Sequence, residues 1–220
     1  MTRCRSLAIV CLATLLAFSA QPLNSQGGLR FSVAGGGYYN SISIQDDGEN
    51  QSLSGFSGGG EGSVAIGRLG LGLRYLEGSV SPSGSGTGAD VVEGEAILSF
   101  RALQWLALKF GPRLRSTITS GVTERWVFWE GRVGTRARLG SPRVVGNLEF
   151  LLMLSGDVNT SESFNGGQGL RGRLSWELSE LPLWIGLGYH IDRIKSRGGL
   201  RTEATEQLVL LIGIGRGARY

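Results

Sequence analysis

The sequence contains few of the residues on which catalytic and metal sites depend. It has 2 cysteines and 1 histidine in 220 residues. Both cysteines, Cys4 and Cys11, lie in the first 20 residues, a segment that we expect to be removed. The rest of the chain therefore offers no thiol, no disulfide and no cysteine metal site. No spacing of histidine and carboxylate residues fits a metal-ligand pattern, so we expect neither a metal nor a cofactor.

A strong charge of one sign is also absent. Lys and Arg number 22 against 18 Asp and Glu, and the basic residues are dispersed along the chain. A sequence pI of 9.4 without a basic cluster does not provide the positive patch that nucleic-acid binding requires. After residue 20 no segment has the pattern of a helix of any length. We therefore expect no nucleic-acid partner and no helical membrane anchor.

The first 20 residues have the features of a secretory signal peptide. Arg3 and Arg5 provide a basic start, an apolar run extends from Leu7 to Phe18, and the small residues Ser19 and Ala20 follow. The apolar run is shorter than the roughly 20 residues of a spanning helix, whereas this order of basic, apolar and small residues is typical of exported chains. We expect cleavage after Ser19 or Ala20 and a single domain over residues 21–220.

Glycine is abundant, with 37 residues, and it alternates with large apolar residues at strand spacing. The pattern is clearest near the end, where Leu208, Leu210, Ile212 and Ile214 share one parity. Such period-2 alternation predicts a strand with one apolar face. Ten segments show it: residues 29–39, 61–66, 69–75, 92–100, 106–115, 127–139, 148–154, 170–178, 183–191 and 208–220. The sequence predicts an all-β fold of about ten strands, or eight because the segment 61–66 is short.

The predicted connections are of two kinds. Short ones fall near Gly67, Ala102, Ser141 and Glu180, and longer polar ones near Asp46, Ser85, Ser120, Ser163 and Gly198. The longest expected loop extends from Ser41 to Gly55 because that stretch is polar and acidic. A strict alternation of short turns and long loops, with an even strand number, indicates a closed antiparallel up-and-down transmembrane β-barrel.

The apolar parity carries large side chains on nearly every predicted strand, while the other parity carries charges, glycine and serine. Aromatic residues on the apolar parity fall near predicted strand ends: Tyr39, Tyr75, Trp129 and Tyr189 toward the long loops, and Phe100, Trp176 and Tyr220 toward the turns. Two such bands are typical of the interfacial girdles of membrane barrels. We therefore expect the apolar parity to face lipid.

The last predicted strand, with alternate apolar residues and a terminal aromatic, resembles the final strand of bacterial outer-membrane β-barrel proteins. The overall pattern over residues 21–220 resembles small OmpA/OmpX-type barrels. This resemblance implies outer-membrane lipids as surroundings, with both ends of the mature chain in the periplasm. It also implies that the barrel-assembly machinery reads Leu210, Ile212, Ile214 and Tyr220. The implied role is structural or surface interaction, or a narrow pore for small ions or solutes.

The inward parity is rich in charge. We expect a ladder of ion pairs that fills the lumen, because buried charges need partners. Its expected members are Glu93, Glu95, Lys109, Arg113, Arg115, Glu130, Arg132, Arg136, Arg138, Glu149, Arg171, Arg173 and Glu177. Because bases exceed acids on this parity, an anion-preferring constriction is the alternative interpretation.

Two other functions compete with that interpretation. His190 and Asp192 share the inward parity and partly resemble, in reversed order, the Asp and His of omptin proteases, so a barrel hydrolase is one alternative. We expect instead an Arg171–Asp192 ion pair beside a spectator histidine, and no enzyme. The other alternative is a soluble secreted β-barrel that turns the apolar parity inward and binds an apolar ligand.

Overall fold

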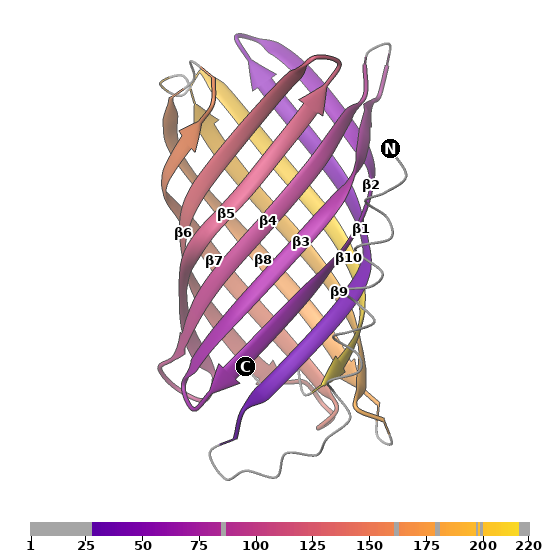
Figure 1. The fold of residues 1–220 in the computed structure, drawn as a ribbon, viewed down its shortest axis with the longest axis vertical. Helices are drawn as coiled ribbons and strands as arrows, with labels where there is room; N and C mark the ends of the chain where they lie inside the picture. Colours follow the sequence, from indigo (N-terminus) through magenta and orange to yellow (C-terminus); the bar gives the residue numbers. More distant parts are fainter. Residues whose placement is uncertain are drawn as a thin grey trace.

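The computed structural model describes residues 28–84, 87–160, 163–178, 181–196, 198 and 200–215. Over them ten antiparallel strands form one closed barrel, in which β1 pairs with β10 and every other pair is sequential (Figure 1). The strands are β1 (Arg30–Asp46), β2 (Glu49–Ile66), β3 (Leu69–Pro82), β4 (Ala89–Arg101), β5 (Leu106–Thr119), β6 (Val122–Arg138), β7 (Val144–Val158), β8 (Phe164–Glu177), β9 (Leu183–Ser196) and β10 (Arg201–Gly215). The predicted all-β, up-and-down barrel of ten strands is confirmed.

The signal peptide predicted at residues 1–20 and the terminal Tyr220 lie outside the described residues. In the described part of the chain there is no helix with the length and apolar character needed to cross a membrane.

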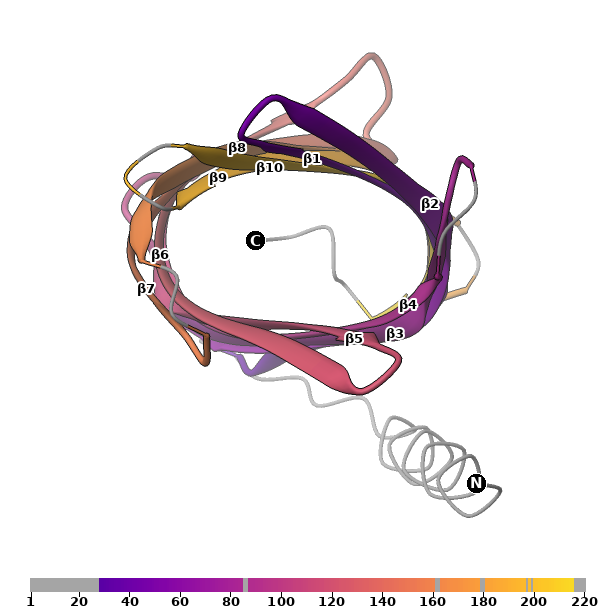
Figure 2. The same cartoon turned by 90° about the horizontal axis from the view of Figure 1, so that it is seen from above.

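The barrel has two distinct ends. At one end, here called the terminal end, β1 begins and β10 finishes; residues 67–68, 102–105, 139–143 and 178–182 connect strands there. At the opposite end, called the far end, the connections are residues 47–48, 83–88, 120–121, 159–163 and 197–200. The terminal end is at the bottom of Figure 1, and Figure 2 shows the single sheet closing on itself when the barrel is seen from above.

The predicted long loop from Ser41 to Gly55 is wrong. β1 continues to Asp46 and pairs with β2 from Glu49 onward, so only Asp47 and Gly48 form the connection. Both have positive φ, 45° and 88°, as a tight two-residue hairpin turn requires. The β5–β6 connection at Ser120 is equally short, so the predicted alternation of short turns with long loops is not what the far end shows.

The strands extend beyond their predicted ends because the apolar side chains change face partway along them. In β1 the outward side chains are apolar up to Tyr39, and then Ser41, Ser43 and Gln45 follow on the same face. On the inward face of β1 the order is reversed: the polar Ser32 lies near the start of the strand, and the apolar Ile42 and Ile44 lie near its end. A search for apolar residues on one parity therefore ends at the middle of the strand.

The half of the barrel nearer the terminal end, the terminal half, is apolar on its outside. Its exposed apolar side chains include Leu69, Leu71, Leu73, Leu98, Phe100, Leu108, Phe110, Leu148, Phe150, Leu152, Leu174, Trp176, Ile185, Leu187, Leu210 and Ile212. The prediction that this parity faces outward is confirmed. A soluble barrel would bury these side chains, so the alternative of an apolar lumen enclosed by them is wrong.

Aromatic side chains mark the upper limit of this apolar surface. Tyr39, Tyr75, Trp129 and Tyr189 are all exposed, but they lie near the middle of their strands because the strands continue past them. The hydroxyl of Tyr75 donates to Glu77 at 2.8 Å, and that of Tyr189 donates to Glu206 at 2.7 Å. Each ring therefore lies beside apolar surface while its hydroxyl bonds to a polar neighbour, as at a membrane–water interface.

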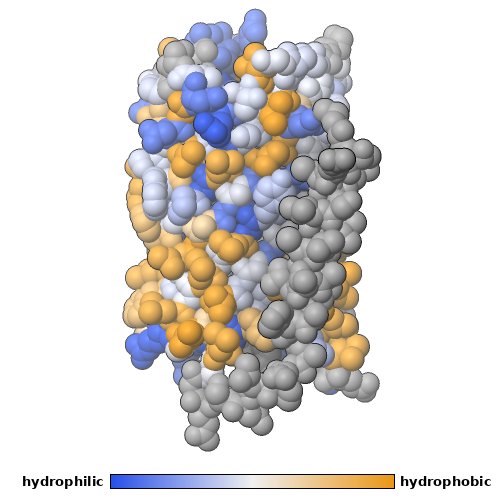
Figure 3. Space-filling view, viewed as in Figure 1, coloured by the Kyte–Doolittle hydropathy of each residue, from blue (hydrophilic) through white to orange (hydrophobic). Residues whose placement is uncertain are grey.

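The half nearer the far end, the far half, is polar outside and apolar inside. Its outward side chains include Ser43, Gln45, Ser52, Glu77, Ser79, Asp90, Thr123, Arg125, Asp157, Gln168, Arg193, Lys195 and Glu206. Inside it, one apolar cluster joins Ile42, Leu53, Val80, Ala89 and Val91, and another joins Trp126, Phe128, Leu151, Met153 and Ile194. Figure 3 shows apolar residues gathered on the lower part of the face it presents. The terminal half thus has the surface of a membrane barrel, and the far half that of a barrel in water.

Arginine substitutions on the outer face test whether the two halves of the barrel lie in different surroundings. Leu71→Arg places a charge on the apolar surface of the terminal half and should lower the free energy of unfolding by about 2–4 kcal/mol. The matched change Ser43→Arg, on the outer face of the far half, should change it by less than about 0.5 kcal/mol. Urea unfolding in lipid vesicles, followed by tryptophan fluorescence, measures both. Equal losses in the two variants would contradict the division.

Two adjacent glycines of β2 test which side chains face inward. A Cβ on Gly59 would lie 2.3 Å from the carbonyl oxygen of Tyr75, whereas a Cβ on Gly58 would meet nothing within 4 Å. Gly59→Ala should therefore cost about 1–3 kcal/mol through overpacking, and Gly58→Ala should be neutral or slightly stabilising. The same unfolding measurement compares them, and a reversed order would mean that the register of β2 is wrong.

Candidate functional site

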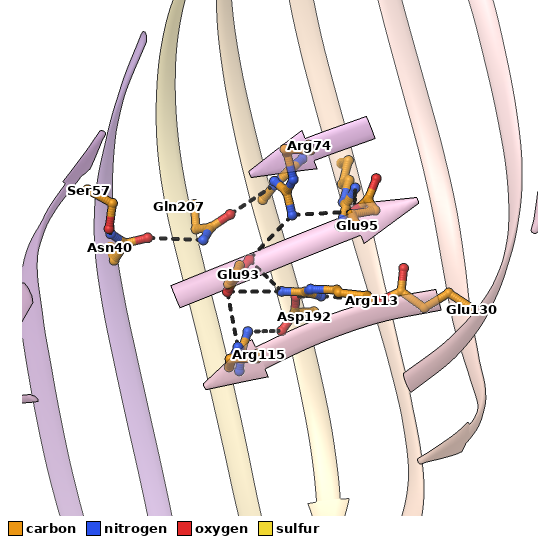
Figure 4. Close-up of polar contacts among 12 residues, drawn as sticks. Asn40, Ser57, Arg74, Glu93, Glu95, Arg113, Arg115, Glu130, Asp192 and Gln207 are labelled. Carbon is orange, nitrogen blue, oxygen red and sulfur yellow. Dashed lines mark hydrogen bonds and ion pairs between the residues drawn. The ribbon is translucent and has the colours of Figure 1, made fainter. Parts of the chain in front are cut away.

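Charged side chains from opposite walls of the barrel meet inside the lumen (Figure 4). They form the lumen ion-pair cluster, defined here as Arg74, Glu93, Glu95, Lys109, Arg113, Arg115, Glu130, Arg132, Glu149, Arg171, Asp192 and Glu203. Strand alternation directs each of these side chains inward, and the barrel is narrow enough for the long ones to reach the opposite wall.

Glu93 lies at the centre of the cluster and is 2% exposed. It accepts from Nη2 of Arg113 at 3.3 Å and from Nε of Arg115 at 3.0 Å, both on the neighbouring strand β5. Arg74 of β3 approaches it at 3.4 Å. One carboxylate on β4 is therefore held by guanidinium groups from both adjacent strands.

Arg113 and Arg115 also bridge the lumen. Nη1 of Arg113 donates to Oδ2 of Asp192 at 2.6 Å and lies 3.3 Å from Oε1 of Glu130. Nη2 of Arg115 lies 3.3 Å from Oδ1 of Asp192, and its Nη1 contacts Glu203. These contacts join β5 to β9 and β10 on the opposite wall, so the cluster spans the lumen.

Glu95 is shared by three arginines. Its Oε2 lies 2.6 Å from Nη2 of Arg132, 2.9 Å from Nη1 of Arg171 and 3.4 Å from Nη2 of Arg74. Arg132 additionally contacts Glu130 at 2.6 Å. The carboxylate of Glu95 therefore has more cationic partners than one negative charge can balance, and only some of these arginines have another acid to pair with.

Two ion pairs lie closer to the terminal end, one within the cluster and one outside it. Within the cluster, Lys109 of β5 pairs with Glu149 of β7. Arg173 of β8 reaches Glu61 of β2 through both terminal nitrogens, at 2.5 and 2.7 Å. This second pair has the bidentate geometry that makes arginine–carboxylate contacts strong and directional.

The central charges of the cluster are buried. The exposed fraction is 0% for Glu130 and 1% for both Arg113 and Arg115, so water does not reach them. A buried charge is tolerated only when it is paired and hydrogen-bonded. In these ion pairs the cations Arg74, Lys109, Arg113, Arg115, Arg132 and Arg171 equal in number the anions Glu93, Glu95, Glu130, Glu149, Asp192 and Glu203.

Besides Arg173, which pairs with Glu61, three residues of the predicted ladder lie apart from the cluster. Arg138 is the last residue of β6 and is exposed, and Glu177 is the last residue of β8. Arg136 lines a small cleft at the terminal end together with Lys109 and Glu149. The structure thus brings the central members of the ladder together and leaves these three near the rim.

The expected Arg171–Asp192 ion pair is wrong. Across β8 and β9, Arg171 lies opposite His190, and Asp192 lies opposite Gly169. Arg171 instead contacts Glu95, and Asp192 contacts Arg113 and Arg115 of β5 across the lumen. Neighbouring-strand register did not predict these partners because an arginine side chain is long enough to cross the lumen.

His190 belongs to a chain of polar contacts that does not include Asp192. Its Nδ1 lies 3.1 Å from Oε1 of Gln207, whose amide nitrogen donates to Asn40 at 3.0 Å. Nη1 of Arg74 lies 3.4 Å from the same Nδ1. In a hydrolytic dyad an acidic residue accepts from the histidine and orients it, whereas here an amide oxygen occupies that place. The geometry therefore does not support the hydrolase alternative.

Several lumen residues were missed by the sequence analysis. Arg201 falls in the region read as a loop, and Glu203 was not counted among the inward residues. Arg201 contacts Glu124 at 3.5 Å and Glu203 at 3.9 Å. Asn40 and Gln207 are each 2% exposed. The signal was present in the parity of β10, since counting back in twos from Gln207 reaches Glu203 and then Arg201 on the inward face.

Between the cluster and the terminal end lies a cavity of about 210 Å³, here called the terminal cavity. Side chains at its rim come from the β2–β3 turn, and deeper ones come from the cluster itself, including Glu95 and Arg132. His190 and Trp184 also line it. In the described part of the chain, no group of His, Cys, Asp and Glu residues could hold a metal ion.

Neutralising the central acid tests how much the fold depends on the cluster. Glu93→Gln leaves the buried Arg113 and Arg115 without one of their counter-charges and should lower the free energy of unfolding by about 3–5 kcal/mol. Glu49→Gln, the same change at an exposed position at the start of β2, should alter it by less than about 0.5 kcal/mol. Urea unfolding in lipid vesicles gives both values. A loss below about 1 kcal/mol for Glu93→Gln would contradict a stabilising role for the cluster.

No protein family model matches the chain, and no curated protein matches it. Several solved structures are similar in backbone. Neisserial surface protein A (NspA) is 14% identical over 85% of this chain and 98% of its own, with a TM-score of 0.39. The translocator domain of the autotransporter NalP from Neisseria meningitidis is 10% identical over 96% of both chains, with a TM-score of 0.47. Ail, the attachment invasion locus protein of Yersinia pestis, is 10% identical over 84% of this chain and 99% of its own, with a TM-score of 0.37.

At these identities the likeness is one of fold alone. The strand pairing and side-chain facing of the chain itself give the firmer assignment. An even number of antiparallel strands, a closed sheet, an apolar outer surface and a charged interior are together the layout of outer-membrane β-barrels.

Proposed function

We propose that this protein is an integral outer-membrane barrel with a structural or surface-interaction role, and that its lumen is closed to ions. The observation that carries this proposal is the lumen ion-pair cluster, in which buried and mutually paired charges bridge opposite walls of the barrel. No reaction is part of the proposed role.

Packing on both sides of the cluster supports a closed lumen. Toward the far end, apolar side chains such as Val80, Phe128 and Leu151 are each at most 1% exposed. Toward the terminal end, the terminal cavity reaches inward as far as Glu95 and Arg132 of the cluster. A ten-stranded barrel has little space beyond what its own side chains fill. A continuous water path would wet the apolar side chains of the far half and the central arginines, whereas Phe128, Arg113 and Arg115 are each at most 1% exposed.

The cluster also bears on the expectation of an anion-preferring pore. Bases exceed acids on the inward parity predicted from the sequence, but the acids that pair with those bases include Glu203, which that prediction left out. Once each central arginine has a carboxylate partner, little net positive field remains along the middle of the lumen. The geometry therefore favours a structural or surface role over a narrow pore.

We further propose that the far half lies outside the cell and that the terminal end faces the periplasm. The polar outer surface of the far half supports placing it in water and not in lipid. The resemblance of the last strand to those of outer-membrane barrels, which implies periplasmic chain ends, supports placing the terminal end in the periplasm. In this orientation Leu210 and Ile212, exposed on the outer face of β10, are available to the barrel-assembly machinery. The short hairpins at residues 47–48 and 120–121 then form a rigid rim at the cell surface.

Single cysteines test the orientation, because the sequence carries no cysteine after residue 20. Ser120→Cys marks the exposed β5–β6 turn at the far end, and Gln104→Cys marks the exposed β4–β5 connection at the terminal end. In intact cells a membrane-impermeant maleimide should label the first variant and not the second. Permeabilising the outer membrane should make both reactive.

The reverse labelling pattern would overturn the proposed orientation. Labelling of neither variant, in intact or permeabilised cells that contain the folded protein, would contradict the assignment of both connections to the ends of the barrel. Ser43→Cys, on the outer face of the far half, serves as a second marker for the cell-surface side.

A further inference from the structure

Of the buried arginines that line the terminal cavity, Arg171 has the fewest acidic partners. Of the three arginines that share Glu95, Arg74 also contacts Glu93 and Arg132 also contacts Glu130. Within the described residues, the acidic partner of Arg171 is Glu95, which it contacts through Nη1. Its Nη2 is buried and has no hydrogen-bond partner among the described residues, and Arg171 as a whole is 8% exposed.

A buried guanidinium nitrogen without an acceptor is unfavourable, because desolvation removes its water without replacing it. Arginine is a donor at every nitrogen and accepts from none. The group that is missing beside Arg171 is therefore an acceptor, and a negatively charged acceptor would give Arg171 the second anionic partner that Arg74 and Arg132 already have.

The wall of the terminal cavity as a whole carries more positive than negative charge. Seven Arg and Lys residues line it, against three carboxylates, Glu61, Glu95 and Glu149. Trp184 also lines it, is 3% exposed, and its Nε1 has no hydrogen-bond partner among the described residues. The indole nitrogen is likewise a donor only. Two buried donors without acceptors thus line a cavity with an excess of positive charge.

We propose that the terminal cavity binds a small oxyanion, a carboxylate or a phosphate, with Nη2 of Arg171 as its principal charged donor. A volume of about 210 Å³ is below the roughly 300–1,000 Å³ of pockets for drug-sized ligands, so the ligand is a small ion. Carboxylates and phosphates both present acceptor oxygens to a guanidinium group. The site is therefore defined by a negatively charged acceptor, and the experiment below distinguishes a carboxylate from a phosphate.

This site is distinct from a conducting pore. The ion enters from the terminal end and stops at the lumen ion-pair cluster, so binding requires no passage through the barrel. It also holds for either orientation of the barrel in the membrane, and its failure would leave the proposed structural or surface role intact.

Isothermal titration of the purified, refolded full-length protein in detergent tests the proposal. Acetate and inorganic phosphate are titrated separately at constant ionic strength in a chloride buffer. Saturable binding of at least one of them is expected, and the tighter of the two identifies the oxyanion class. Arg171→Gln should weaken binding about tenfold or more, since a hydrogen bond to a charged group is lost. Arg138→Gln, an exposed arginine outside the cavity wall, should leave the affinity unchanged.

Folding of Arg171→Gln is checked by circular dichroism and by electrophoretic migration before and after heating. A second variant keeps the proposal testable if Arg171→Gln does not fold. Trp184→Phe retains an aromatic ring and removes only the Nε1 donor, and it should weaken binding several-fold. Absence of saturable binding of either anion by the folded protein would overturn the proposal. So would an affinity unchanged in folded Arg171→Gln, or in Trp184→Phe if that is the variant that folds.

Discussion

The constraint on which this structure depends is that a strand crossing lipid must have every backbone hydrogen bond satisfied within the sheet. Pairing of β1 with β10, from Ser32 opposite Gly215 to Asp46 opposite Arg201, satisfies it by closing the barrel. Closure fixes alternate residues of every strand inside a narrow lumen. Charged side chains on that parity can avoid isolation only by meeting one another, which is what the lumen ion-pair cluster achieves.

The barrel also crosses two environments with one continuous sheet. In the terminal half large apolar side chains cover the outside, and in the far half the outside is polar and two apolar clusters fill the inside. The alternation of side chains is interrupted only locally, at the irregularities in the β6–β7 and β8–β9 pairings. The cluster lies between the apolar packing of the far half and the terminal cavity. Paired charges that bridge the middle of the lumen suit the proposed structural or surface role better than a conduit.

The sequence was sufficient to predict the strand number, the closure and the outward parity of the terminal half, because large apolar residues recur there every second position. The sequence pattern gave a wrong prediction in the far half, where a loop was expected over Ser41–Gly55. There β1 and β2 continue with their apolar residues on the other parity. The Asp47-Gly48 pair is a strong hairpin signal, and it could have located that turn. Contacts across the lumen, such as Arg113 with Asp192, could not be predicted, because strand register specifies only adjacent strands.

If the buried ion-pair cluster closes the lumen, the barrel should not conduct ions. Conductance of the refolded mature protein in a planar lipid bilayer, with a salt gradient across it, tests this closure. We expect a folded, inserted barrel with no conductance steps, and discrete steps in Glu93→Gln when enough of that variant folds to insert. Discrete steps in the unaltered protein, with either ion preference, would show that water and ions pass the cluster and that the lumen is open.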